Sequence, residues 1–250
     1  MIAPRPGWRL PRFFAHRCGG ALAPENTLAG LRLAARLGAR AIEFDVTLSA
    51  NGSPWLIHDL TLERTTTGRG HVCQTDDTVL NRLDAGSAHH LAFAGEPLPT
   101  LHDAARLCRE LDLRVNLEIK PAPGQEAETG AVVAAAARRL WVGAPLPLLS
   151  SFSERALAAA RGSASELPIG ALYHRPPADW PERLNRLAAA TLHCHADCAD
   201  DRLLRIAKER QIAVLCYTVN DPATAAALFQ RGVTSVFTDR IDCLGDHDAG

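Results

Sequence analysis

Two short apolar segments carry carboxylates at every second position. In the segment 41–46, Glu43 and Asp45 share one face of an extended chain, and the apolar side chains share the other face. The segment 115–120 repeats this pattern, with Glu118 on the face opposite its apolar residues. Strand interiors rarely hold acids for packing alone, so the repeated pattern indicates a chemical role.

A divalent-cation site is the chemistry that these acids favour. Neighbouring strands lie only about 4.8 Å apart, and carboxylates that close raise one another's pKa unless a cation joins them. Oxygen ligands suit a hard ion such as Mg²⁺ or Ca²⁺. The alternatives are ion pairs with Arg17 and Lys120, or carboxylates exposed at strand ends. We therefore predict a metal site formed by Glu43, Asp45 and Glu118.

Two histidines are placed near the same acids. His16 ends the first apolar segment of the chain, and Asn51-Gly52 is a strong signal for a tight hairpin turn. A hairpin centred on that turn brings His58 opposite residues 43–45. A lone histidine is more often structural. A pair around one set of acids favours general acid and general base roles at neutral pH.

The elements that must position these residues alternate along the chain. Eight segments are predicted as strands: 13–16, 41–46, 115–119, 146–151, 169–172, 191–193, 214–217 and 235–238. Seven helices are predicted between them: 26–37, 99–112, 125–140, 153–161, 179–189, 200–210 and 221–231. Strand and helix in alternation indicate parallel pairing. Eight such strands predict a closed (β/α)8 barrel, with an open doubly wound sheet as the alternative.

One region interrupts this alternation between the second strand and its helix. It spans roughly residues 47–98 and contains a predicted return strand, 55–58, followed by a polar, glycine-containing stretch. A loop of this length in a compact domain is usually functional or a small insertion. We predict a single domain, 1–250, that carries this insertion.

A second group of potential ligands lies near the end of the barrel sequence. His193, Cys194, His195 and Cys198 resemble ligands of a soft metal. The C-x3-C spacing is weak evidence for zinc, so we expect His193 to line the barrel mouth as a substrate contact and the thiols to be small buried residues. Six histidines without visible partners are predicted on the surface or in loops: His71, His89, His90, His102, His174 and His247.

Composition and charge exclude several classes of partner. The 250 residues are 47% hydrophobic, which is sufficient for one sizeable core. A formal net charge of −1 leaves no basic field for nucleic acid or an anionic membrane. Seven cysteines without framework spacing are typical of reduced thiols. With no pattern of a signal peptide or membrane span, we predict a cytoplasmic protein without stable membrane association. The oligomeric state is left open.

Several motifs together resemble those of the glycerophosphodiester phosphodiesterase family, cytosolic bacterial type. The sequence has HRCGG at 16–20 with PENT at 24–27, EFD at 43–45, HD at 58–59 with LERTT at 62–66, and EIK at 118–120. Weaker similarities occur at 150–152, 217–220 and 238–239. The similarity spans roughly 14–245, and the set of motifs is specific although each motif alone is not.

The resemblance implies a (β/α)8 barrel with an insertion after its second strand. It also implies hydrolysis of small glycerophosphodiesters to sn-glycerol 3-phosphate and an alcohol. The roles carried over by position are acid and base for His16 and His58, divalent-ion ligands for Glu43, Asp45 and Glu118, and phosphate contacts for Arg17 and Lys120.

One position departs from the family pattern. Cys18 stands where the family usually has its first glycine. Because it follows His16 closely, just past a predicted strand end, we expect it at the rim of the site and sensitive to thiol reagents. The alternative is a buried, inert thiol.

Three other functions compete with hydrolysis of glycerophosphodiesters. A lysophospholipase D would need an apolar channel for an acyl chain. A non-catalytic glycerol-phosphate-binding barrel would not require the histidine pair. A metal-dependent sugar or amide hydrolase barrel usually carries H-x-H on its first strand, which His16-Arg17-Cys18 lacks.

Overall fold

A computed structural model describes residues 10–244 of the chain, and eight parallel strands in it form a closed barrel. The strands are β1 (Phe13–Ala15), β2 (Ala41–Leu48), β4 (Arg114–Ile119), β5 (Leu148–Ser151), β6 (Ile169–Tyr173), β7 (Thr191–His195), β8 (Ala213–Tyr217) and β9 (Ser235–Thr238). Each barrel strand pairs in parallel with the next, and β1 pairs with both β2 and β9. These two pairings close the ring, so the predicted barrel is confirmed and the open-sheet alternative is wrong.

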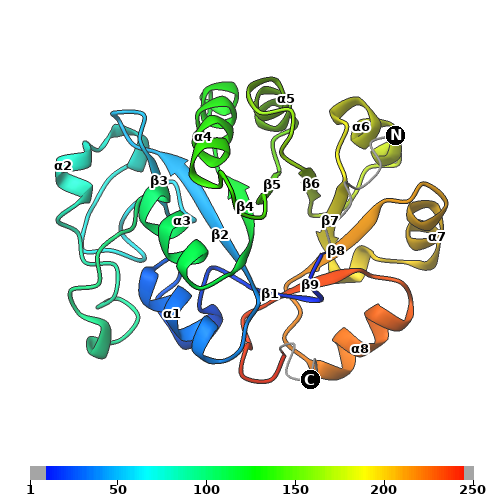
Figure 1. The fold of residues 1–250 in the computed structure, drawn as a ribbon, viewed down its shortest axis with the longest axis horizontal. Coiled ribbons are helices and arrows are strands. Elements are labelled where there is room, and N and C mark those ends of the chain that lie inside the picture. Colours follow the sequence, from blue (N-terminus) through cyan, green and yellow to red (C-terminus); the bar gives the residue numbers. More distant parts are fainter. Residues whose placement is uncertain (1–9, 245–250) are drawn as a thin grey trace.

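Seven helices follow one another around the strands in chain order (Figure 1). They are α1 (Leu28–Arg36), α3 (Leu101–Glu110), α4 (Glu126–Leu140), α5 (Glu154–Ser163), α6 (Trp180–Leu187), α7 (Asp201–Glu209) and α8 (Pro222–Gln230). Five of them begin after a residue whose side-chain oxygen accepts a hydrogen bond from the first turn: Thr27, Thr100, Ser153, Asp200 and Asp221. Such caps satisfy backbone N–H groups that have no partner within the helix. Because capping residues are visible in the sequence, the predicted starts of these helices lie close to the observed ones.

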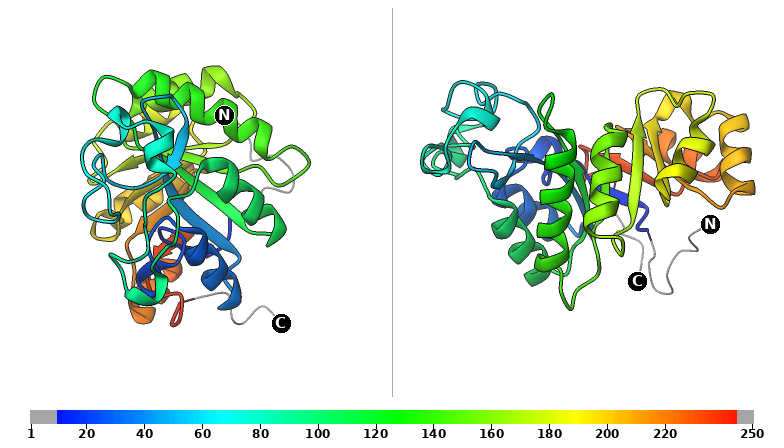
Figure 2. Two further views of the ribbon diagram at one scale, coloured as in Figure 1. Left: turned by 90° about the vertical axis from the view of Figure 1, so that its left-hand side faces the viewer. Right: turned by 90° about the horizontal axis from the view of Figure 1, so that it is seen from above.

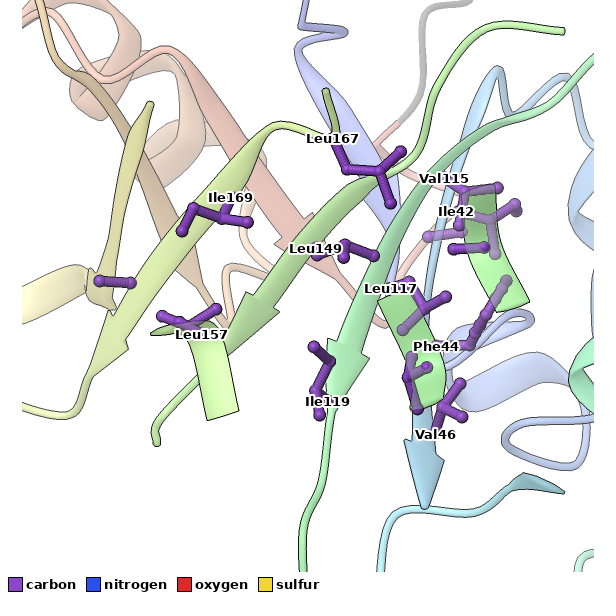
Figure 3. Close-up of a cluster of buried hydrophobic side chains, with 14 of the residues drawn as sticks. Ile42, Phe44, Val46, Val115, Leu117, Ile119, Leu149, Leu157, Leu167 and Ile169 are labelled. Atoms are coloured by element: carbon purple, nitrogen blue, oxygen red, sulfur yellow. The ribbon is translucent and has the colours of Figure 1, made fainter. Parts of the chain in front are cut away.

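Alternation along the strands separates the packing surface from the barrel interior. The apolar side chains of β2 and β4 lie together on one side of their strands, in the core between strands and helices (Figure 3). The residues between them face the interior. Part of that interior is filled by an apolar plug, which consists of Phe14, Ala41, Leu148, Leu215 and Phe237.

The insertion extends from residue 49 to residue 100, between β2 and α3, and lies to one side of the barrel (Figure 2). It begins with β3 (Pro54–Leu56), which pairs antiparallel with β2, and continues through η2 (Val72–Gln74), α2 (Asp77–Leu80) and η3 (Leu91–Phe93). A small hydrophobic core of its own holds it together: Trp55, Ile57, Leu62, Val72, Leu80, Ala85 and Leu98. A folded insertion of this kind can hold side chains rigidly over the neighbouring strand.

The boundaries differ from the predicted ones in small but relevant ways. The insertion starts at 49 rather than 47 because β2 continues to Leu48, and the return strand ends at Leu56 rather than at 58. His16 and His58 therefore each follow a strand instead of lying within one. Among the described residues, none of the helices is long and apolar enough to span a membrane. His247 lies outside the described part of the chain.

Candidate active site

Strand register brings the three predicted metal ligands together. In the parallel pairing of β2 with β4, Asp45 lies beside Glu118 and Glu43 lies beside Asn116. One carboxylate oxygen from each of Glu43, Asp45 and Glu118 lies within 4.8 Å of the other two. All three side chains are buried. The cluster results from the period of two in both strands together with a register that the sequence did not specify.

The electrostatics of this cluster are unfavourable without a cation. Burial, followed by the neighbouring Asp45 and Glu118 charges, raises the pKa of Glu43 well above its usual value. Burial and the Asp45 charge raise the pKa of Glu118 to about 7. Within the described residues, Oε1 of Glu43 is buried without any hydrogen-bond partner. Three buried carboxylates with a free oxygen are a donor set that fits a hard divalent ion.

Two basic side chains flank the carboxylates. Nζ of Lys120 lies 3.3 Å from Oε1 of Glu118 and 3.9 Å from Oδ1 of Asp45. Nε of Arg17 lies 3.9 Å from Oδ2 of Asp45. The ion-pair layer considered as an alternative is therefore present, but within the described residues it pairs Asp45 and Glu118, whereas the basic side chain beside Glu43 is His16, with Nε2 3.9 Å from Oε2 of Glu43. Arg17 and Lys120 are available to an anion that enters the barrel through its C-terminal mouth.

Asp45 is held by a residue that sequence reasoning did not single out. Asn26 donates from Nδ2 to Oδ2 of Asp45 at 3.0 Å, and its Oδ1 accepts from the Asp45 backbone N–H at 3.0 Å. Asn26 adopts a left-handed backbone with φ of 56°, which asparagine tolerates better than most residues. Its place in the PENT motif was the only sequence signal for this role.

His16 is oriented by an aspartate from the far end of the chain. Its Nδ1 lies 2.7 Å from Oδ1 of Asp239, which follows β9, and its Nε2 lies 3.9 Å from Oε2 of Glu43. Asn220 in turn donates to Oδ2 of Asp239 at 3.2 Å. The ring is therefore fixed at Nδ1 and presents Nε2 toward the carboxylates.

His58 has a matching arrangement on the opposite side. Its Nδ1 lies 2.7 Å from Oδ1 of Asp59, and its Nε2 lies 3.2 Å from Nζ of Lys120. Burial lowers the pKa of His58, and the charge of Lys120 lowers it further, although Asp45 and Asp59 oppose this shift. Each histidine therefore uses Nδ1 for an aspartate and directs Nε2 toward the cluster.

Arg64 connects the insertion to both sides of the site. It donates to both oxygens of Asp59 at 2.6 and 2.9 Å, and to both oxygens of Glu25 at 2.7 and 2.8 Å. Glu25 also accepts from NH1 of Arg17 at 3.2 Å. Arg64 thus positions His58 through Asp59, and Arg17 through Glu25.

We expect Arg64→Ala to lower kcat about 10- to 100-fold, because small misplacement of reacting groups is costly. Arg64→Lys should recover only part of the loss, since an ammonium cannot reproduce the planar fork of donors. The measurement is kcat and KM for both variants, with thermal unfolding as the check on stability. Arg106→Ala removes an exposed ion pair on α3 and serves as the control. Wild-type kcat in Arg64→Ala would show that the insertion does not position the histidine.

A single cavity of about 250 Å³ brings all eight predicted site residues together. Its lining includes His16, Arg17, Glu43, Asp45, His58, Glu118, Lys120 and His193. His193 lines this cavity although it is fully buried. His174, predicted as a surface or loop residue without partners, also lines the cavity and stacks on Phe152 with ring centroids 4.7 Å apart.

The zinc alternative finds no support in the described part of the chain. There, the three carboxylates are the only group of His, Cys, Asp or Glu side chains close enough together to hold a metal. Cys194 is buried in the core between strands and helices, as expected for a small apolar side chain. His195, in contrast, is exposed.

The fold and this cavity define a (β/α)8-barrel protein with a carboxylate cluster at the C-terminal mouth, where barrel enzymes carry out their chemistry. Residues 16–243 match the model of the glycerophosphoryl diester phosphodiesterase family. A glycerophosphodiester phosphodiesterase from Caldanaerobacter subterraneus is 31% identical over 234 residues, which cover 92% of this chain and 94% of that protein. The chain therefore belongs to the glycerophosphodiester phosphodiesterase family.

Solved structures agree with this assignment. A phosphodiesterase from Oleispira antarctica, in complex with the product sn-glycerol-3-phosphate, has a TM-score of 0.88 and 38% identity, over 92% of this chain and 93% of that chain. A glycerophosphodiester phosphodiesterase from Agrobacterium tumefaciens has a TM-score of 0.78 and 27% identity, over 93% and 98%. The predicted fold and enzyme class are confirmed, and the sugar or amide hydrolase alternative is wrong.

Cys18 does not lie at the rim, which corrects our expectation. Its side chain has no exposed surface and belongs to the core between strands and helices, close to Gly30 of α1. Burial raises the pKa of its thiol well above the usual value. Its backbone has φ of 73°, a left-handed conformation that favours glycine. That conformation accounts for the glycine that the family usually has at this position. Of the two predicted environments for Cys18, the structure shows the buried, inert thiol.

We accordingly expect that a small alkylating agent does not react with Cys18 in the native enzyme, so that this residue causes no loss of activity. Mass spectrometry should find label first on the exposed Cys243, while Cys18 stays unlabelled until the protein unfolds. Cys18→Gly should keep its activity, because glycine adopts the required backbone readily. Inactivation that follows labelling of Cys18, and that Cys18→Gly abolishes, would contradict the burial argument.

Proposed function

We propose that this chain hydrolyses small glycerophosphodiesters to sn-glycerol 3-phosphate and an alcohol, with the help of a divalent cation. The observation that carries the proposal is the convergence of three buried carboxylates, two aspartate-bound histidines and two basic side chains on one cavity. Family membership supports the same reaction class. Binding alone would not require two histidines whose Nε2 atoms both point to one anionic cluster.

Glu43, Asp45 and Glu118 would hold the cation, which we propose to be Mg²⁺ or Ca²⁺. Its positive charge, once bound, balances the carboxylates and the charge that develops on the phosphate oxygens. The free Oε1 of Glu43 and the raised pKa values of Glu43 and Glu118 support this assignment.

Arg17 and Lys120 would bind the non-bridging phosphate oxygens. Both are cations beside the carboxylate cluster, and fixed positive charge in a partly buried site stabilises a transition state better than water does. Arg17 is held from behind by Glu25, so its orientation is set before the substrate arrives. His193, buried deeper in the same cavity, is the third proposed substrate contact.

His16 and His58 would move the protons. One Nε2 takes a proton from the nucleophile, and the other gives a proton to the leaving alcohol. The aspartate at each Nδ1 keeps the ring oriented and supports its charged form when a proton is held at Nε2. The nucleophile is either water or the 2-hydroxyl of the glycerol, and either histidine can serve as the base.

The decisive experiment measures release of glycerol 3-phosphate from glycerophosphocholine, glycerophosphoethanolamine and glycerophosphoglycerol. Activity should disappear on exhaustive chelation and return with Mg²⁺ or Ca²⁺. Detergent-dispersed lysophospholipid is the comparison substrate, and it should be hydrolysed poorly. The adjoining cavity of about 510 Å³, which shares His16 and Arg17, is lined by charged side chains such as Glu25, Arg64 and Asp239, and these do not suit an acyl chain. Preference for the lysolipid would favour a lysophospholipase D, and binding of glycerol phosphates without turnover would contradict the proposal.

We also propose that the enzyme works in the cytoplasm. All seven cysteines are free, and four of them are buried. Free thiols persist in a reducing compartment. Cell fractionation with an activity assay checks this, and recovery of the activity in a membrane fraction would contradict it.

A further inference from the structure

Two buried polar side chains that line the cavity each have an atom without a partner among the described residues. Asn116 is 1% exposed and His193 is 0% exposed, and both line the cavity. Among the described residues, neither Oδ1 of Asn116 nor Nδ1 of His193 has a hydrogen-bond partner. Buried polar atoms are almost always paired, so these two atoms are expected to meet a ligand.

Each side chain is fixed at its other end, which sets the direction of the free atom. Asn116 donates from Nδ2 to Oγ of Ser150 on β5 at 3.0 Å. His193 makes a 2.8 Å hydrogen bond through Nε2 with Oγ1 of Thr191. The Cδ2–Nε2 edge of the ring lies against Gly170, where an added Cβ would come within 2.6 Å of Nε2. Nδ1 therefore lies on the ring edge that faces away from β6.

These two residues adjoin the proposed metal ligands, because Asn116 lies beside Glu43 in the pairing of β2 with β4 and both residues line the same cavity as the carboxylates. Asn116 precedes Glu118 by two residues on β4, which corresponds to about 7 Å along the strand. The apolar plug borders them: Leu148 lies beside Asn116 and Leu215 beside His193 in strand register, and the Phe237 ring is 5.4 Å from the His193 ring. A phosphate held by Arg17 and Lys120 would leave the part of the cavity beside Asn116 and His193 to a short chain that ends in hydroxyl groups.

We infer that Asn116 and His193 form a subsite for the free vicinal diol of the glycerol moiety, which enters the barrel with its hydroxyls inward. A hydroxyl both donates and accepts a hydrogen bond. It therefore suits the amide and the imidazole in either orientation or tautomer. Burial lowers the pKa of His193 to about 3, so the ring is neutral and also offers one donor and one acceptor. The inference rests on the proposed function and adds the recognition of its substrate.

The diol subsite accounts for the direction in which the substrate binds. With the glycerol hydroxyls at Asn116 and His193, the phosphate would reach Arg17 and Lys120, and the alcohol to be released would point out of the barrel. Leaving a buried polar partner unsatisfied is expensive, so a ligand without the diol should bind much more weakly. The subsite therefore predicts selectivity for the glycerol part and tolerance for the outer alcohol.

The test compares ligands on the wild-type protein loaded with Mg²⁺, by titration calorimetry. The reference ligand is sn-glycerol 3-phosphate, which has both hydroxyls. 2-Hydroxypropyl phosphate and 3-hydroxypropyl phosphate each keep one of the two hydroxyls, and n-propyl phosphate has neither. We expect each deletion to weaken binding about tenfold. Because this series needs no substitution, it decides the question even if a variant fails to fold.

Asn116→Leu and His193→Phe then locate the effect. Each should bind glycerol 3-phosphate about tenfold more weakly, and the preference for it over n-propyl phosphate should shrink by the same factor. His195→Phe is the matched control, since this exposed histidine on the same strand lies outside the cavity, and it should keep the full preference. Thermal unfolding verifies that all three proteins are folded.

Two results would overturn the inference. One is wild-type protein that hydrolyses glycerophosphocholine but binds the four ligands equally, which leaves the proposed function intact. The other is a pair of variants that weaken all four ligands alike, which would show a structural role. Absence of any phosphodiester hydrolysis would instead contradict the proposed function, so the two failures are distinguishable.

Discussion

Glu118→Gln is expected to lower kcat/KM for glycerophosphodiesters about 10³-fold or more, because it removes one anionic ligand from the proposed cation site. The affinity for Mg²⁺ or Ca²⁺, measured by calorimetry, should fall together with the activity. Glu128→Gln on the exposed face of α4 is the control and should keep the wild-type metal dependence. Full turnover after exhaustive chelation, or wild-type metal dependence in Glu118→Gln, would show that the cluster is not a cation site.

The same substitution should stabilise the metal-free protein at alkaline pH. The folded pKa of Glu118, about 7, lies above the ordinary value of 4.5. The folded state therefore binds the proton more tightly, and stability falls as pH rises through the window between these values. The ionisation of Glu118 should accordingly lower the Tm of the metal-free wild type at pH 8 relative to pH 4.5. Glu118→Gln should remove this contribution to the pH dependence of Tm. An equal pH dependence of Tm in both proteins would contradict the raised pKa.

His16→Ala and His58→Ala are each expected to lower kcat by about 10² to 10⁴, with little change in KM, because general acid and base steps are worth about that much. The double variant should lose less than the product of the single losses, since the two groups act in one reaction.

The measurement is kcat for the two single variants and the double variant, with Tm as the check on folding. His102→Ala, an exposed histidine on α3, is the matched control. If either single variant keeps a near-normal kcat, that histidine is structural and the pairing with the other is wrong.

Local patterns explain why much of the site was predictable. The period of two placed Glu43 and Asp45 on one face of β2, and this depends only on the geometry of an extended chain. A tight turn at Asn51-Gly52 implied that residues equally far before and after the turn face each other, and the observed pairing of Val46 with Leu56 agrees. His58 then had to lie near the acids.

Partners that are distant in the chain could not be predicted in this way. Asp239 lies 223 residues from His16, and only closure of the barrel through β1 and β9 brings the two together. The bonds from Arg64 to Glu25 depend equally on how the insertion packs against the N-terminal loop. Neither contact leaves a periodic trace, because each joins single residues at the ends of different elements.

The sequence by itself determined the alternation of strands and helices, the inward face of each acidic strand and the nearness of His58, because these follow from chain geometry over a few residues. Only the tertiary structure decided that Cys18 is buried, that His174 lines the cavity, and that Asn116 and His193 line the same cavity as the carboxylates. Burial and convergence depend on the register of several strands and on the packing of helices over them. These contacts depend on residues from the whole chain, and they form only when the barrel closes.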